Sequence, residues 1–502
     1  GYTPFAFDIT DALNEAGTQD LVVRVWDHQG REHFVSSGKQ TENKYYEPSS
    51  GIWQTVWLEP RAAGAIESLV SNASLGNKAV ELTVAAEDYA EIRIEVIEGA
   101  NVVAAGKGAP NRPLEIAIPD PKAWEPGSPF LYDLNILLLK DGKAVDTVQS
   151  YFGLRDIRID KSLDGPQIVL NGKALFHFGP LDQGYWPLST LTPPTDEALE
   201  FELKYIKSIG SNMVRLHGKR NPSRWYYYCD KYGLMVWQDF IFNRADESVQ
   251  TAPGELERWK NEQQMLMDSL NNHPSVVKWI VFNEEWGQHD TENTVEWARS
   301  LLPNHIVTAA SGWNDVDDLG DIRDVHDYER FPSLTHPDSE PNRAVVLGET
   351  GGFGVPINGN NWLEMPEPQL PDNPEFRVTG RDRQGGMKPL KTSADRDFVT
   401  DIRRPVYTAE GMVPHYERYI DALWLGQTWG LSGGVYTQLT DMRHEQNGWL
   451  TFDRKVSKIP VAKMREIHEK LYREIPKRRR LVTSPAGFAN SAIAFTVEEA
   501  PP

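Results

Sequence analysis

Residues 276–282 (VVKWIVF) are followed directly by Asn283 and Glu284. A run dominated by β-branched, aromatic and other apolar residues is typical of a strand buried on both faces, as in a parallel sheet. The pattern recurs at residues 344–347 (AVVL), which Gly348 separates from Glu349. The sequence therefore predicts two buried parallel strands that each end in a carboxylate.

From about residue 156 onward, short apolar runs alternate with longer stretches of helical periodicity, such as residues 195–209 and 256–271. The other candidate strands are residues 174–178, 212–216, 234–237, 306–310, 324–327 and 434–438. Eight strands with helices between them predict a (β/α)₈ TIM barrel over residues 156–480. A doubly wound sheet, the alternative, would normally carry a glycine-rich phosphate turn after its first strand, and residues 178–182 (FGPLD) do not supply one.

The residues before the barrel carry the pattern of antiparallel sheets. Residues 20–26 alternate, and residues 52–58 form a β-branched and aromatic run after the turn at 48–51, so residues 1–60 are expected to form part of a β-sandwich. Short runs separated by turn residues predict an immunoglobulin-like β-sandwich over residues 61–155. Residues 481–502 are expected to be a C-terminal tail or the start of a further domain.

Charge and composition exclude two classes of partner. The formal net charge is -20, and the one dense basic run is residues 477–480, so we expect no nucleic acid to bind. Apolar runs are too short for a membrane span. Cys229, the single cysteine, is expected to be a core residue. The chain opens with neither Met nor a leader pattern, so the compartment stays unknown, with a periplasmic or secreted place favoured over the cytoplasm.

In a closed barrel, Glu284 and Glu349 would both face the mouth at the carboxyl ends of the strands. Retaining glycosidases need two carboxyl groups about 5 to 5.5 Å apart, one to attack the anomeric carbon and one to protonate the leaving oxygen. A glutamate after a strand can also simply cap the next helix. Because two glutamates occur at strands four and seven, we interpret Glu284 as the acid/base and Glu349 as the nucleophile.

The chain resembles glycoside hydrolase family 2, the group of β-galactosidases, β-glucuronidases and β-mannosidases. The resemblance rests on residues 1–10 (GYTPFAFDIT), residues 50–59 (SGIWQTVWLE), residues 151–155 (YFGLR) and residues 170–172 (LNG). It implies that residues 1–60 are the C-terminal half of a sugar-binding jelly-roll β-sandwich, and it implies the same roles for Glu284 and Glu349. It also implies that Arg215 lies under the nucleophile, that Asn283 binds the sugar 2-hydroxyl and that Tyr328 donates a hydrogen bond to the nucleophile.

Further polar residues follow the predicted strands, at the rim where sugar hydroxyls would bind. These rim candidates are Asp182, Gln183, His217, Asp239 and His326. The histidines lack the close His/Glu spacing of a metal site, so we expect no catalytic metal and no cofactor. The connection at residues 351–408, rich in Pro, Gly and charge, is either a lid over the site or a surface insertion.

The sequence departs from the β-glucuronidase pattern, in which an Asn-x-Lys pair precedes Asp-Arg-Lys. Residues 445–450 (EQNGWL), before residues 453–455 (DRK), lack that pair. We therefore expect a retaining exo-β-glycosidase acting on the terminal neutral sugar of an oligosaccharide or polysaccharide end, as a β-galactosidase does, with a β-glucuronidase or β-mannosidase as the alternatives. A non-catalytic carbohydrate-binding protein, a transglycosidase with the same glutamates and a homo-oligomer all remain open.

Overall fold

The structure is a computed structural model of the 502-residue chain. It describes residues 1–14, 17–25, 46, 49–62, 64–86, 91–163, 165–242, 254–328, 340–360, 380–381, 387–388, 409–443 and 445–475. The predicted tail at residues 481–502 and the basic run at 477–480 lie outside these residues, as does most of the connection at 351–408.

Eight parallel strands close into a barrel, in the order β13-β14-β15-β16-β17-β18-β19-β22. The strands are β13 (His177–Asp182), β14 (Met213–Leu216), β15 (Met235–Asp239), β16 (Val276–Asn283), β17 (Ile306–Ser311), β18 (Ile322–Asp327), β19 (Ala344–Thr350) and β22 (Leu431–Tyr436). The predicted barrel is therefore confirmed. The first strand starts later than expected, because Lys173 and Ala174 pair with a small antiparallel sheet instead.

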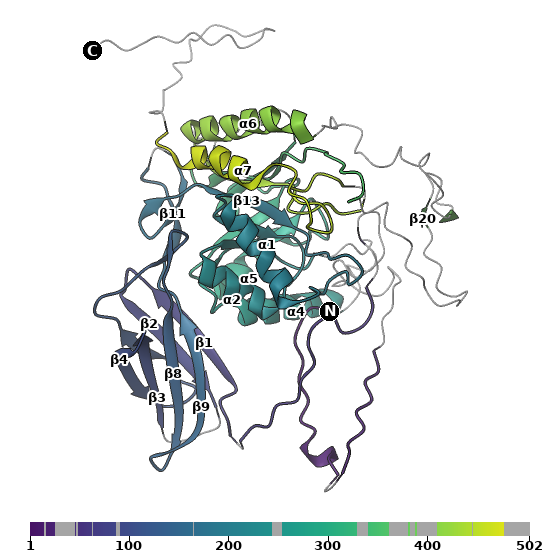
Figure 1. Ribbon diagram of the computed structural model, residues 1–502. Coiled ribbons are helices and arrows are strands. Elements are labelled where there is room, and N and C mark those ends of the chain that lie inside the picture. The colour runs from purple at the N-terminus through teal and green to yellow at the C-terminus, as the bar shows by residue number, and fades with distance from the viewer. Residues whose placement is uncertain are drawn as a thin grey trace.

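Helices cover the outside of the barrel (Figure 1). They are α1 (Asp196–Ser208), α2 (Ser223–Tyr232), α4 (Glu255–Leu270), α5 (Thr291–Leu301), α6 (Ala409–Gly426) and α7 (Val461–His468). Thr195 caps the start of α1 by accepting a hydrogen bond from the Ala198 amide, and Gly233 ends α2 in the left-handed conformation. None of the helices described has the length and apolarity that crossing a membrane requires.

An antiparallel β-sandwich precedes the barrel, as predicted for residues 61–155. One sheet has the order β1-β2-β5 and the other β4-β3-β8-β9. The strands are β1 (Ser68–Ser74), β2 (Ala79–Ala85), β3 (Glu91–Glu98), β4 (Asn101–Gly108), β5 (Leu114–Ala117), β8 (Tyr132–Lys140) and β9 (Lys143–Phe152), with the short pair β6 (Trp124–Glu125) and β7 (Ser128–Pro129). Alternate residues of β2, β3 and β8 are buried, and they form the core between the two sheets.

Between the sandwich and the barrel lies a small sheet of β10 (Ile157–Asp160), β11 (Gln167–Leu170) and β12 (Lys173–Ala174). One apolar cluster contains Ile157, Ile168 and Leu170 of this sheet, together with Trp124 and residues of the barrel interior. This sheet therefore closes the end of the barrel opposite the carboxyl ends of its strands.

The strands expected at residues 20–26 and 52–58 are not formed in the part of them that the structure describes, so these two expectations are wrong. The described N-terminal residues contain one short helix, η1 (Thr10–Ala12), and extended backbone that reaches away from the barrel (Figure 1). A strand needs a hydrogen-bonded neighbour, and no described segment pairs with this backbone. Its apolar side chains, such as Phe7, Val22 and Trp57, are consequently exposed.

Candidate active site

The two glutamates come together at the barrel mouth. Glu284 follows the last residue of β16, and Glu349 lies near the end of β19. Three atoms lie within 4.8 Å of one another: one carboxylate oxygen of each glutamate and one ring nitrogen of His326. The side chain of Glu284 is 20% exposed and that of Glu349 is 9% exposed, so Glu284 faces solvent and Glu349 lies deeper. This separation is close to what a retaining glycosidase uses.

The backbone at Glu284 is strained. Glu284 and Glu285 have φ angles of 47° and 67°, in the left-handed region that non-glycine residues seldom adopt. The Glu284 amide donates a hydrogen bond of 2.9 Å to the Ser311 carbonyl at the end of β17. Such conformations persist where the surrounding structure holds them and gather at functional sites. Here the sharp turn after β16 aims the Glu284 side chain across the mouth.

Glu349 receives hydrogen bonds from two side chains. Arg215 donates through Nη1 to Glu349 Oε1 at 3.4 Å, and the Tyr328 hydroxyl donates to Oε2. Arg215 is fully buried, and it also donates to Asn283 Oδ1 at 2.7 Å. Arg215 and Tyr328 therefore both contact Glu349, and Arg215 links Asn283 to the same group; the roles expected of the three residues in catalysis remain predictions.

Asp239 fixes Arg215 in this position. Its two oxygens accept from Arg215 Nε and Nη2 at 3.0 Å each, and His217 Nδ1 lies 2.8 Å from Oδ2. Burial alone would raise the pKa of Asp239, but Arg215 and His217 lower it to about 2. Burial would likewise lower the pKa of Arg215, but Asp239 and Glu349 raise it above its ordinary value. The pair therefore stays ionised and keeps a positive charge under Glu349.

His326 contacts the other glutamate. Its Nδ1 lies 2.7 Å from Glu284 Oε1 and 3.9 Å from Glu349 Oε2, and its Nε2 lies 2.8 Å from Ser311 Oγ. Burial lowers the pKa of His326, but the nearby Glu349 charge and the hydrogen bond to Glu284 raise it above its ordinary value. His326 thus acts on Glu284 directly, rather than standing on the outer rim.

The remaining rim candidates have partners within the protein. Asp182 Oδ1 accepts from the Gly184 amide at 2.7 Å, which fixes the turn after β13. Gln183 Oε1 accepts from the Tyr46 hydroxyl at 3.3 Å. His217 contributes through Asp239, as described above. Each of these side chains therefore has a partner within the protein, and their binding of sugar hydroxyls remains a prediction.

Sequence reasoning missed the aromatic wall of the mouth. Trp286 packs edge-on against Phe242 with ring centroids 4.8 Å apart, and His217 lies 5.6 Å from Trp286. Tyr46, from the N-terminal segment, is buried beside Phe242 at 6.4 Å and Tyr185 at 5.9 Å. Trp286 could have been noticed as the residue two places after Glu284. Nothing in the local sequence indicates that Tyr46 reaches the barrel.

Glu284, His326 and Glu349 are the residues that could hold a metal ion among those the structure describes. Glu349 already accepts from Arg215 and Tyr328, and the guanidinium would repel a divalent cation. The expectation that catalysis needs no metal remains a prediction.

Residues 52–155 match the family model described as "Glycosyl hydrolases family 2", and residues 168–341 match its TIM barrel domain. The second match includes Glu284 and ends before Glu349. A putative β-glucuronidase of Formosa agariphila is 29% identical over 311 residues, which are 58% of this chain and 35% of that protein. A β-galactosidase of Streptococcus thermophilus is 26% identical over 327 residues, 60% of this chain and 30% of that protein.

The chain thus spans about a third of the length of these curated relatives. Among solved structures, a β-galacturonidase of Eisenbergiella tayi bound to galacturonate covers 88% of this chain and 78% of its own, with a TM-score of 0.63 and 18% identity. A β-glucuronidase of Dictyoglomus thermophilum has a TM-score of 0.58 at 17% identity, over 83% of this chain and 70% of its own. At these identities, the structures show a shared fold.

Proposed function

Because the chain belongs to family 2 of the glycosyl hydrolases, we propose that it is a retaining exo-β-glycosidase that removes a terminal neutral sugar by double displacement. The observation that carries the proposal is the approach of Glu284 and Glu349, whose carboxylate oxygens lie within 4.8 Å of each other. Glu349 attacks the anomeric carbon, and Glu284 protonates the leaving oxygen and then activates water.

The surroundings suit these two roles. Glu349 accepts a charge-assisted hydrogen bond from the buried Arg215 at 3.4 Å, which orients its carboxyl group for attack. Glu284 is the more exposed of the two, so a leaving group and then water can reach it. Asn283 accepts from Arg215 through Oδ1, and its buried Nδ2 has no partner among the described residues. That amide is therefore available to donate to a sugar hydroxyl next to the anomeric carbon.

The contacts of two basic side chains favour a neutral sugar as the substrate. Lys219 donates to the carbonyls of Gly184 and Leu191, at 2.6 and 3.1 Å. Arg454, in the motif after β22, donates to Glu202 at 2.8 Å. These two cations are already engaged by the protein, which disfavours them as partners of a uronic acid carboxylate. The names of the relatives include both β-galactosidases and β-glucuronidases, so a β-glucuronide is the second candidate substrate.

The test is a comparison of nitrophenyl β-galactoside, glucoside, mannoside, fucoside and glucuronide. We expect turnover of at least one neutral glycoside and a loss of roughly 10³-fold or more in rate for Glu349→Ala. Glu285→Ala is the matched control, because Glu285 has the same left-handed backbone but an exposed side chain, and it should keep wild-type turnover. A 2-fluoro glycosyl fluoride of the preferred sugar should label Glu349 in a peptide digest.

Other outcomes separate the alternatives. Unchanged turnover in Glu349→Ala rejects the assignment of the nucleophile. Sugar binding without hydrolysis across the panel favours a non-catalytic carbohydrate-binding protein. Glycosyl transfer to an added sugar in preference to water favours a transglycosidase with the same two glutamates.

A further inference from the structure

The loop after β17 is attached directly to the catalytic groups. The Ser311 carbonyl accepts from the Glu284 amide at 2.9 Å, and its hydroxyl lies 2.8 Å from His326 Nε2. Further along, the Asn314 carbonyl accepts from Gln288 Nε2 at 2.9 Å. Both ends of the short segment 311–314 are therefore held by residues that follow β16 or lie near the end of β18.

Gly312 brings this loop into contact with the His326 ring. Its φ is +90°, and a Cβ at this position would lie 2.8 Å from His326 Nδ1. A side chain at residue 312 would thus collide with the imidazole that touches Glu284. Trp313, the next residue, is carried on backbone whose place relative to Glu284 is fixed.

Trp313 is exposed despite this close support. Its indole is 48% exposed and stands edge-on to His326, with ring centroids 5.9 Å apart. Tryptophans on the neighbouring elements, such as Trp259 and Trp279, are almost fully buried. A large apolar ring left open to solvent beside a reactive group is a candidate surface for ligand binding.

We propose that Trp313 is the platform on which the leaving group rests, and that its ligand is the pyranose ring on the far side of the bond to be cleaved. This inference rests on the proposed function. Glu284 protonates the leaving oxygen. His326 contacts Glu284, and the exposed indole of Trp313 packs against His326 on its solvent side. The sugar that reacts with Glu349 lies deeper, beside Asn283. The ring that departs therefore passes the exposed indole.

The chemistry suits a sugar. A pyranose presents a face of C–H groups, which packs against an aromatic ring while the hydroxyls stay in water. Such a contact discriminates between leaving groups, because a substrate with no second ring gains nothing from it. Trp313 would thus act as a specificity residue and would have no role in bond cleavage itself.

The test compares two substrates that share the sugar cleaved. If the panel selects galactose, these are lactose, which has a second ring, and methyl β-galactoside, whose leaving oxygen also needs a proton but which has no second ring. For another preferred sugar, they are its β-1,4-linked disaccharide with glucose and its methyl β-glycoside. We expect Trp313→Ala to lower kcat/KM for the disaccharide about 10-fold and to leave the methyl glycoside within about 2-fold. Trp313→Phe, which keeps a ring, should recover part of the loss.

Trp429→Ala is the control, because Trp429 is 38% exposed but precedes β22, at the opposite end of the barrel. It should leave both substrates unaffected. An equal loss for disaccharide and methyl glycoside in Trp313→Ala would overturn the proposal, since it would mean that the indole supports the catalytic geometry. Unchanged disaccharide turnover would overturn it too. A wild-type protein that cleaves neither substrate would reject the proposed function, and the platform with it.

Discussion

Arg215 is the residue at which the charges of the site meet. It donates to Glu349, Asn283 and both oxygens of Asp239 from a fully buried position. The planar guanidinium supplies several donors in a fixed geometry, which a lysine ammonium cannot reproduce. One side chain therefore orients the nucleophile and the proposed hydroxyl ligand together.

Arg215→Lys should therefore lower kcat/KM about 100-fold or more, because Glu349 and Asn283 lose their common donor. Arg343→Lys is the matched control: Arg343 is also buried and donates to Asp315 and Glu340, but it precedes β19 at the far end of the barrel. That variant should lose stability and keep its activity. Measuring turnover and thermal unfolding of both variants separates a loss of activity from a loss of stability. An Arg215→Lys enzyme with wild-type activity would contradict the role given to the several donors of the guanidinium.

At the scale of the element, the loop after β17 depends on Gly312. Gly312→Ala would place a methyl group 2.8 Å from His326 Nδ1 and shift the imidazole away from Glu284. We expect at least a 10-fold loss of kcat/KM. Gly142→Ala, in the turn between β8 and β9, has a φ of +73° and no atom within 4 Å of the new methyl group. It bears the same backbone cost of about 1–2 kcal/mol without the collision. Equal activity in the two variants would count against the contact with His326.

How far the sequence predicts such elements depends on the range of the interactions. The barrel strands follow from local apolar runs, and the end of each strand places Glu284 and Glu349 because a closed barrel brings all its carboxyl ends to one mouth. Tyr46 reaches the wall through contacts with Gln183 and Phe242, far away in the chain, which no local pattern encodes. The N-terminal runs show the converse, since local β-propensity at residues 52–58 forms no strand in the absence of a described partner.

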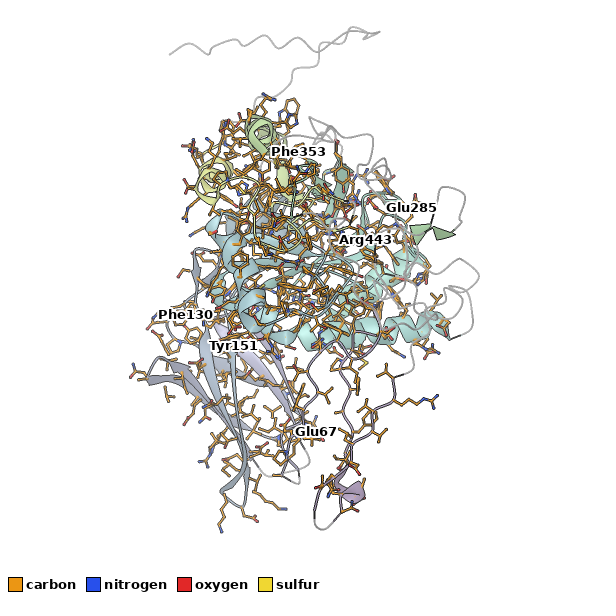
Figure 2. All side chains as sticks on the ribbon, turned by 45° about the vertical axis from the view of Figure 1, so that its right-hand side comes forward. Glu67, Phe130, Tyr151, Glu285, Phe353 and Arg443 are labelled. Atoms are coloured by element: carbon orange, nitrogen blue, oxygen red, sulfur yellow. The ribbon has the colours of Figure 1, made fainter. Side chains whose placement is uncertain are left out.

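At the scale of the whole molecule, the sandwich and the barrel share a buried polar junction. Tyr151, whose hydroxyl donates to Asp230 Oδ2 at 2.8 Å, lies where the two domains meet (Figure 2). Trp124 Nε1 donates to the Asp230 carbonyl at 2.7 Å. Arg155 donates to the carbonyls of Pro274, Asn304 and Val276 at 3.0, 2.5 and 2.7 Å. The sandwich is thus bonded to the end of the barrel opposite the catalytic mouth.

Arg155→Met tests whether this junction stabilises the fold. Burial lowers the pKa of Arg155 to about 10, so the guanidinium is still charged at neutral pH, and its removal deprives three carbonyls, two of them buried, of this donor. At about 1 kcal/mol or more for each, we expect the free energy of unfolding to fall by roughly 3 kcal/mol in urea titrations. Arg158→Met, three residues later, removes an exposed arginine whose ion pair is with the partly exposed Asp160, and it should change stability by less than about 0.5 kcal/mol. Because the junction lies away from Glu284, Arg155→Met should keep wild-type kcat/KM under conditions where it is folded. An unaltered unfolding midpoint would mean that the two domains are held together by the apolar contacts around Trp124 alone.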